Sequence, residues 1–363
     1  MREETEELYW YWIHNIEGIG YKTIQALLSD GKTAKQVYEE DARYWNTILT
    51  DRQKNAFNMS KHLEQITRNY EKLQEKGIRF VSIANEAYPS RLRNIDSPPF
   101  GLYIRGKLPQ ENRPTIAIIG TRNSSAYGEE MARYFARELS KCGITIMSGM
   151  ARGIDAIAQK SALQGQGGAC AVLGCGVDIC YPRENFSLYQ TLIQKGGILS
   201  EYPPGTPPKA GLFPIRNRII SGLADGILVI EAKEKSGTQI TVDWALDQGK
   251  EIYALPGRAS DPLSEGCNRL IQMGAKLVTK VEDLREDFPS IPRDLSKNYE
   301  NNQKTLDKKQ RVVYSCLSLE PKYIDSIIKE TKLSVQEALS ALFELEVAGL
   351  IRQVISNYYI ISK

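Results

Sequence analysis

The sequence predicts a mixed α/β protein: a doubly wound, Rossmann-like parallel sheet between a helical N-terminal domain and a C-terminal winged-helix domain. Between residues 115 and 278, short continuous apolar runs alternate with amphipathic segments of helix length. Such apolar strands are typical of a parallel sheet that helices cover on both faces. At the end of the chain, three helical segments precede two strand-like runs, which is the order of elements in a winged helix.

Composition limits the class of protein. A chain of 363 residues is long enough for several domains of roughly 100–200 residues each. The net charge of +3 is compatible with a nucleic-acid partner but does not indicate one. No apolar run approaches the roughly 20 residues of a membrane helix, and the first ten residues are acidic where a signal peptide would be basic and apolar. We therefore expect a cytoplasmic protein with no membrane partner.

Histidine and cysteine usage argues against several catalytic sites. The two histidines, His14 and His62, both lie near the N-terminus. A His/Cys zinc site, a Ser-His-Asp triad or an imidazole base in the central region would lack its main residue. The six cysteines include no CxxC pair, which favours reduced, buried thiols. We expect no metal, no cofactor and no catalytic residue.

Residues 1–77 predict a small helical domain, because apolar residues recur at helical spacing in 24–28 and 63–73. Residues 16–23, IEGIGYKT, have the form of a helix-hairpin-helix turn, as in SAM-like domains, whose glycines let backbone N–H groups approach a phosphate. A tight turn that only packs two helices is the alternative. Residues 26–33, ALLSDGKT, resemble a P-loop but have Ala for the first glycine and follow a helix, so nucleotide hydrolysis is not expected.

The central domain, residues 78–287, contains the ligand site that the sequence predicts. We expect strands at 116–119, 144–147, 169–173, 197–200, 227–230 and 251–255, and an amphipathic helix at 128–142. Ligands bind outside the carboxyl ends of such strands. There, glycines clear space, helices are expected to begin near Gly153 and Thr238, and Arg122 and Arg152 supply bidentate donors to phosphate. The candidate phosphate-binding residues are Gly120, Thr121, Arg122, Ser148, Gly149, Arg152, Gly153, Asp155, Gly174, Gly176, Phe213, Arg216, Asn217, Arg218, Ser236, Gly237 and Thr238.

Two details refine this site. On a helix, Arg216 and Arg218 diverge in direction, so only one of them is expected to face the crevice unless the helix begins between them. A dinucleotide cofactor is not expected, because no GxGxxG motif follows the first strand. The nearest segment, GCGVDI at residues 174–179, has Ile in place of the third glycine and follows the third strand.

Residues 288–307 are polar and are expected to form a linker. Residues 308–363 predict the winged helix, with helices at 310–319, 323–330 and 334–348 and a hairpin of 350–354 and 358–361 turning at Ser356 and Asn357. The candidate recognition helix, 334–349, carries three glutamates and neither Lys nor Arg. We therefore expect the winged helix to bind DNA poorly.

The motifs in the central domain resemble those of the DNA-processing protein A family, also called DprA or Smf. They are GTRNSSAYG, SGMARGID, LGCGVDICYP, FPIRNRIISGLAD and SGTQITVDWALDQGKEIYALPG, the last followed by SEGCNRLIQMGA. The resemblance covers about residues 88–278. It implies a single-stranded DNA-binding protein that dimerises, with the Rossmann-like domain as the expected interface, protects incoming DNA in natural transformation and loads the recombinase RecA. It assigns DNA contacts to Arg122, to residues 148–155, and to Arg216, Asn217 and Arg218.

Two other functions stay open on the same fold. Phosphoribohydrolases of nucleoside monophosphates carry a PGGxGTxxE motif with a catalytic Glu. The comparable residues 234–241, EKSGTQIT, have Thr241 at that position, so a binding protein is expected rather than an enzyme. A sensor that binds a nucleotide and signals through the winged helix is the other alternative.

Overall fold

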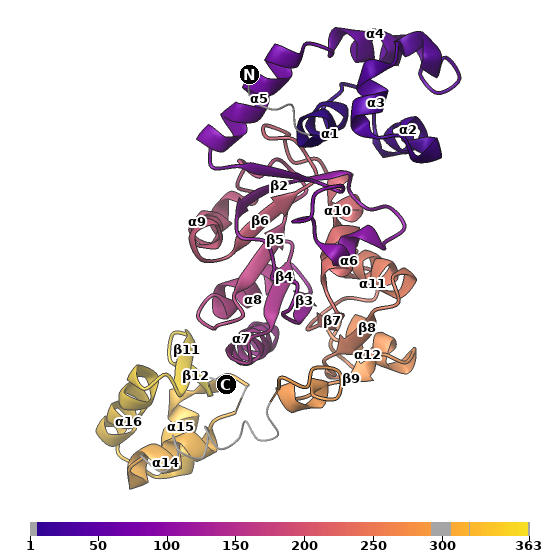
Figure 1. The fold of residues 1–363 in the computed structure, drawn as a ribbon. Coiled ribbons are helices and arrows are strands. Elements are labelled where there is room, and N and C mark those ends of the chain that lie inside the picture. Colours follow the sequence, from indigo (N-terminus) through magenta and orange to yellow (C-terminus); the bar gives the residue numbers. More distant parts are fainter. Residues whose placement is uncertain (1–5, 292–305, 319, 362–363) are drawn as a thin grey trace.

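The computed structural model describes residues 6–291, 306–318 and 320–361 (Figure 1). Helices at the N-terminal end lie on one end of a sheet-containing body, and the C-terminal lobe lies at the other end (Figure 1). Most of the expected linker falls outside the described residues, and the helix expected at 310–319 ends earlier than predicted, at Cys316. No helix of the described residues is long and apolar enough to cross a membrane.

A nine-stranded sheet forms the centre of the body, in the order β1-β2-β6-β5-β4-β3-β7-β8-β9. The strands from β3 to β9 pair in parallel, whereas β2 pairs antiparallel with β6 and with β1. From β3 the chain adds β4, β5 and β6 on one side and then returns to add β7 on the other, which confirms the doubly wound prediction. The strands are β1 Arg79–Ser82, β2 Gly101–Gly106, β3 Thr115–Ile119, β4 Thr145–Ser148, β5 Ala169–Val172, β6 Gly197–Ser200, β7 Gly226–Val229, β8 Glu251–Ala254 and β9 Lys276–Leu277.

Helices cover both faces of this sheet because each strand is buried on both sides. Along β3, Ile116 and Ile118 join one hydrophobic core while Ala117 and Ile119 join the other, as strand alternation requires. The first core lies under α7 (Ala126–Lys141), α8 (Ile154–Ala162) and α9 (Phe186–Lys195). The second lies under α6 (Ser90–Arg93), α10 (Leu212–Leu223), α11 (Gly237–Asp247) and α12 (Glu265–Gln272).

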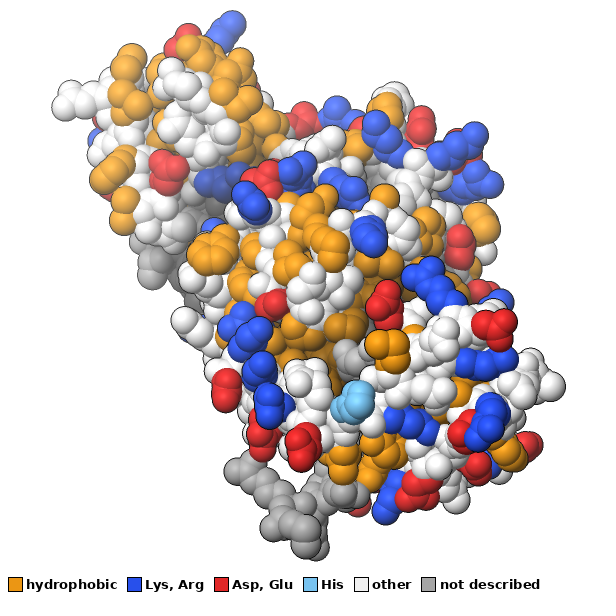
Figure 2. Space-filling view, turned by 90° about the horizontal axis from the view of Figure 1, so that it is seen from above, with side chains coloured by type: hydrophobic (Ala, Val, Ile, Leu, Met, Phe, Trp, Pro, Cys, Tyr) orange, Lys and Arg blue, Asp and Glu red, His pale blue; other side chains and the backbone are white. Residues whose placement is uncertain are grey.

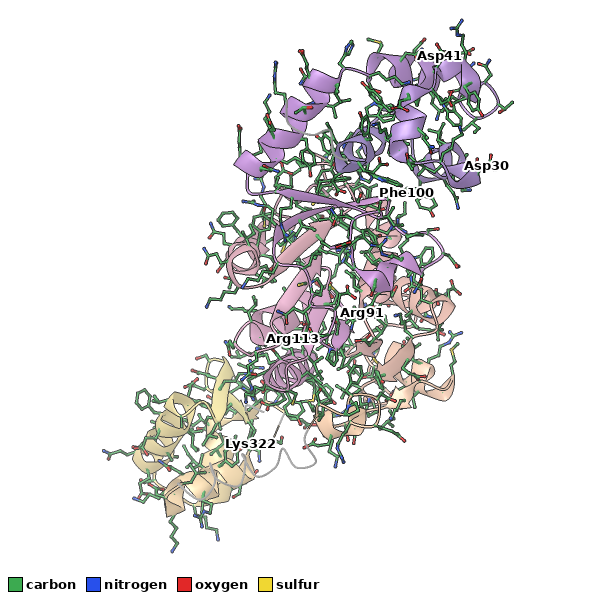
Figure 3. The ribbon with its side chains drawn as sticks, in the orientation of Figure 1. Asp30, Asp41, Arg91, Phe100, Arg113 and Lys322 are labelled. Carbon is green, nitrogen blue, oxygen red and sulfur yellow. The ribbon has the colours of Figure 1, made fainter. Side chains whose placement is uncertain are left out.

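The N-terminal helices share the first core with the sheet. They are α1 (Glu6–His14), α2 (Tyr21–Leu27), α3 (Ala34–Glu39), α4 (Asp51–Met59) and α5 (Leu63–Glu75). Phe100, which lies between these helices and the sheet, stacks on Tyr21 with ring centroids 4.9 Å apart (Figure 3). The backbone N–H and the hydroxyl of Ser82 in β1 donate to the Glu7 carboxylate of α1 over 2.6 and 2.7 Å. The domain boundary that the sequence predicts near residue 77 therefore does not separate two hydrophobic cores.

The segment from 16 to 33 contains a turn between two helices, as predicted. Gly18 has φ +75°, which favours glycine, and Gly20 precedes α2. The P-loop-like segment begins in the last turn of α2 and includes a short 3-10 turn at Ser29–Gly31, so it is not preceded by a strand.

The C-terminal lobe is a winged helix with α14 (Lys308–Cys316), α15 (Ile324–Thr331), α16 (Val335–Val347) and the hairpin β11 (Ile351–Ile355) and β12 (Tyr358–Ile361). A short strand that the sequence analysis missed, β10 (Lys322–Tyr323), pairs with β12. Among the described residues, two ion pairs join the lobe to the body: Arg352 donates to Glu130 over 2.9 Å, and Arg258 pairs with Glu320.

We expect Glu7→Ala to lower the free energy of unfolding by about 1–3 kcal/mol, because the Ser82 N–H and hydroxyl would lose their acceptor in a partly buried site. Denaturant unfolding would measure this change. Glu6→Ala removes the same charge from the exposed neighbouring position and is the matched control. Equal effects of the two substitutions would show that the contact between α1 and β1 contributes nothing.

Candidate nucleic-acid interface

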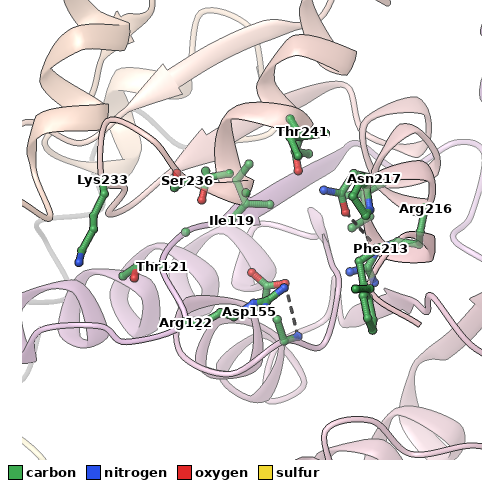
Figure 4. A pocket seen from close by; sticks show the side chains of 18 of the residues that line it. Ile119, Thr121, Arg122, Asp155, Phe213, Arg216, Asn217, Lys233, Ser236 and Thr241 are labelled. Carbon is green, nitrogen blue, oxygen red and sulfur yellow. Dashed lines mark hydrogen bonds between the residues drawn. The ribbon is translucent and has the colours of Figure 1, made fainter. Parts of the chain in front are cut away.

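A pocket of about 630 Å³ opens at the carboxyl ends of β3, β4 and β7, next to the place where the strand order reverses (Figure 4). The loops after β3 and β4, the start of α10 and the start of α11 form its walls. Open parallel sheets bind ligands at this position. The predicted site residues that line it are Gly120, Thr121, Arg122, Asp155, Phe213, Arg216, Asn217, Ser236, Gly237 and Thr238.

The other predicted site residues do not line the pocket: Ser148, Gly149, Arg152, Gly153, Gly174, Gly176 and Arg218. Most of the glycines among them let other groups approach. A Cβ on Gly149 would lie 2.5 Å from the Arg216 guanidinium, and one on Gly174 would lie 2.8 Å from the Phe213 ring. Gly153, with φ +69°, precedes α8, and a Cβ there would lie 2.4 Å from the Thr121 carbonyl oxygen. These glycines therefore shape the pocket wall.

Arg216 is part of that wall. Its side chain enters from α10, is only 5% exposed, and donates to the carbonyl oxygens of Gly149, over 3.0 Å, and Val172. Burial lowers the pKa of Arg216 to about 10, while the nearby charge of Asp155 opposes that shift. Asp155 is itself buried and accepts from the backbone N–H groups of Gly149 and Ala151 over 3.1 and 3.4 Å. Burial raises the pKa of this carboxyl.

Arg218 points away from the pocket. Its guanidinium makes a bidentate contact with the Glu201 carboxylate over 3.2 and 2.6 Å. The Glu201 carbonyl oxygen in turn accepts from His14 Nε2 over 2.7 Å, and burial lowers the pKa of that imidazole. Arg216 is thus the arginine of the pair that faces the crevice. Both lie within α10, which begins at Leu212, before either of them.

Three kinds of donor that line the pocket are available to an anion. Arg122 is exposed on the loop after β3 and makes no ion pair with a described residue. The Ser236 Oγ atom is buried and has no hydrogen-bond partner among the described residues. Ser236 precedes α11, where no side chain caps the first backbone N–H groups. A helix N-terminus with free N–H groups beside a hydroxyl and a guanidinium can bind a phosphate.

The pocket also has an aromatic rim, of which the sequence analysis predicted Phe213 but missed Tyr181. Tyr181, 45% exposed, stacks on Phe213 with ring centroids 5.5 Å apart and an interplanar angle of 29°. Tyr181 comes from the long connection after β5, and Lys233, also missed, comes from the loop after β7. An aromatic surface beside anion donors can bind a base and its phosphate together.

Residues 79–289 match the profile of the family described as DNA recombination-mediator protein A, and residues 298–354 match the DprA winged helix domain. The chain belongs to the DNA recombination-mediator protein A family. It is 36% identical to Protein Smf of Escherichia coli over 333 residues, covering 90% of this chain and 88% of that protein. It is 40% identical to DNA processing protein DprA of Bacillus subtilis over 217 residues, covering 60% of this chain and 73% of that protein.

Two solved structures of proteins from this family share the fold of the chain. DprA from Streptococcus pneumoniae matches with a TM-score of 0.67 and 32% identity, covering 79% of this chain and 99% of that one. DNA processing protein A from Helicobacter pylori matches with a TM-score of 0.53 and 32% identity, covering 58% of this chain and 95% of that one. The Helicobacter structure was described for its single-stranded DNA binding mode.

We expect Arg216→Ala to lower the free energy of unfolding by at least about 1–3 kcal/mol, because two buried carbonyl oxygens would lose their donor. Arg152→Ala is the matched control: its guanidinium is 59% exposed and its pair with Glu184 should contribute less than about 1 kcal/mol. Chemical denaturation of both variants would measure the difference. A variant Arg216→Ala as stable as Arg152→Ala would contradict a structural role for the buried arginine.

Proposed function

We propose that this chain binds single-stranded DNA in the crevice at the carboxyl ends of β3, β4 and β7. Phosphate would contact Arg122, the Ser236 hydroxyl and the first N–H groups of α11, and a base would stack on the Tyr181 and Phe213 rings. The observation that carries this proposal is the presence of free anion donors and a stacked aromatic pair in one pocket. The single-stranded DNA binding described for the Helicobacter relative agrees with it.

A preference for single strands follows from the aromatic rim. Stacking on Tyr181 requires an unpaired base whose face is accessible, and every base has such a face. The donors in the pocket suit phosphate oxygens rather than base edges, so we expect weak dependence on sequence. On the face seen from the N-terminal end, Lys and Arg side chains lie among Asp and Glu side chains (Figure 2). The described residues of that face therefore do not form an extended basic groove for the DNA backbone.

Binding rather than catalysis is favoured by the carboxylates of the pocket. Thr241, at the position that corresponds to the catalytic Glu of phosphoribohydrolases, is buried in the pocket wall. Among the described residues that line the pocket, the carboxylate is that of Asp155, which is engaged by two backbone N–H groups. A general acid or base would need a carboxyl group free to reach a ligand. Incubation with nucleoside monophosphates should therefore release no free base.

Membership of the family supports a finer role. We propose that the chain protects single strands during natural transformation, loads RecA onto them in the cytoplasm, and acts as a homodimer through its Rossmann-like domain. Exposed Met273 and Leu277 at the β9 edge of the sheet support a self-association surface there. Sedimentation of the full chain and a RecA strand-exchange assay on coated single strands would test these two parts separately.

We expect Arg122→Ala to weaken binding to oligo-dT by roughly ten- to a hundredfold, since a lost charge-assisted contact costs about 1.5–3 kcal/mol. Lys160→Ala, on the exposed surface of α8, removes the same charge and should cost well under 1 kcal/mol. Arg122→Lys should recover only part of the affinity, because it keeps the charge but not the bidentate fork. If the Arg122→Ala variant is folded and binds oligo-dT like the unmodified chain, the DNA does not bind in this crevice.

We expect Tyr181→Ala to weaken oligo-dT binding by about 1–3 kcal/mol, the usual range for one stacked base. Tyr44→Ala, at a similarly exposed tyrosine of the N-terminal helices, is the matched control. Salt titrations separate the two kinds of contact. Arg122→Ala should lower the slope of log K against log salt by about 0.7, whereas Tyr181→Ala should leave that slope unchanged. If Tyr181→Ala binds oligo-dT with full affinity, no base stacks on the aromatic rim.

A further inference from the structure

The outer face of α16 carries a row of exposed apolar side chains. Val335, Leu339, Phe343 and Val347 are 59, 45, 68 and 72% exposed. The helix packs on its lobe through a different face, made of Ala338, Ala341, Leu342 and Leu345. In Figure 1, α16 lies on the side of the winged helix farthest from the body, and in Figure 2 the same lobe, at the upper left, shows hydrophobic side chains on its surface.

The spacing of these four residues distinguishes them from ordinary surface apolar residues. Single exposed hydrophobic side chains are common and need no explanation. Here each residue is four positions from the next, so together they form one ridge along the whole helix. Ridges of residues four apart are the ones that fit into the groove of a second helix. We call these four residues the α16 ridge.

Negative charge flanks the C-terminal half of the α16 ridge. Glu346 follows Phe343 by three positions and Glu344 precedes Val347 by three, so each carboxylate lies beside the ridge. Glu337 is neutralised by Lys309 over 2.9 Å. Glu344 and Glu346 accept only from neutral donors in the described part of the chain, namely Gln310 and Ser340 for the first and the Gln353 N–H for the second. The negative end of the helix dipole adds to their charge.

The negative charge beside the α16 ridge argues against two binding partners, duplex DNA and a second copy of this chain. Duplex DNA would bring phosphates against Glu344 and Glu346 on a helix that has neither Lys nor Arg. A second copy of this chain, docked ridge to ridge, would offer these carboxylates no Lys or Arg from its own α16. An apolar surface with Lys or Arg at its edges satisfies both the ridge and the carboxylates.

We propose that the α16 ridge is a docking site for a second protein, which contributes an amphipathic helix with an apolar stripe flanked by Lys or Arg. Phe343 and Val347 enter the apolar stripe, and Glu344 and Glu346 pair with the basic residues beside it. This surface is separate from the crevice, so its occupation does not require single-stranded DNA. The helix that reads DNA in other winged-helix proteins is here a protein-binding element.

A displayed library of helical peptides, selected on the full-length protein, tests this proposal. We expect the selected peptides to carry apolar residues three or four positions apart with Lys or Arg beside them. Phe343→Ser should weaken their binding by at least about tenfold, the loss typical of a central aromatic contact. Glu344→Gln with Glu346→Gln should weaken binding and reduce its salt dependence.

Ile355→Ser, at a 66% exposed apolar residue of the same lobe outside the α16 ridge, is the matched control and should bind the peptides normally. Thermal melting should show that all variants are folded, and each should bind oligo-dT like the unmodified chain. Selection of acidic peptides, or of peptides that bind Phe343→Ser as well as the unmodified protein, would overturn the proposal. So would self-association or duplex DNA binding that Phe343→Ser abolishes.

Discussion

The crevice depends on one buried cation. Arg216 reaches from α10 across the carboxyl ends of β4 and β5, where its guanidinium binds the carbonyl oxygens of Gly149 and Val172. A charge buried this deeply is stable only where its donors are satisfied and a counter-charge is near. Asp155 supplies that counter-charge and also holds the loop after β4 through two N–H groups. Arg216 thus ties α10 to the loop after β4 and to the end of β5 in one wall of the pocket.

The opposite wall has a corresponding support in Glu231, which follows β7. Its buried carboxylate accepts from the N–H of Ser125, over 3.0 Å, and from the Ser125 hydroxyl, at the start of α7. Gly128 is required there because a Cβ would lie 2.1 Å from that carboxylate. Arg216 and Glu231 both make hydrogen bonds within the pocket walls, so neither is free to bind a ligand. The groups that remain for a ligand are Arg122, the Ser236 hydroxyl and the first N–H groups of α11.

The sequence predicted those parts of the fold and site that depend on local pattern. Continuous apolar runs located β3 to β8, and the rule that ligands bind after parallel strands located the pocket. The antiparallel strands β1 and β2 were missed because they precede the alternation of strands and helices that begins near residue 115, and β9 was missed because it has two residues. Spacing suggested that Arg216 and Arg218 diverge, but their burial depends on Gly149, Val172 and Glu201, which are distant in sequence. Tyr181 was missed for the same reason, since its partner Phe213 lies 32 positions away.

The two terminal parts of the chain are joined to the crevice in different ways. The N-terminal helices share a core with the sheet, and His14 contacts Glu201, which holds Arg218 on the same helix as Arg216. A shift of the N-terminal helices would therefore be transmitted to α10, which forms part of the pocket wall. In the described part of the chain, the winged helix is joined to the body by the exposed pair of Arg258 and Glu320, which contributes little, and by Arg352, which donates to the buried Glu130 of α7. A protein held on the α16 ridge would raise its own concentration near the strand bound in the crevice.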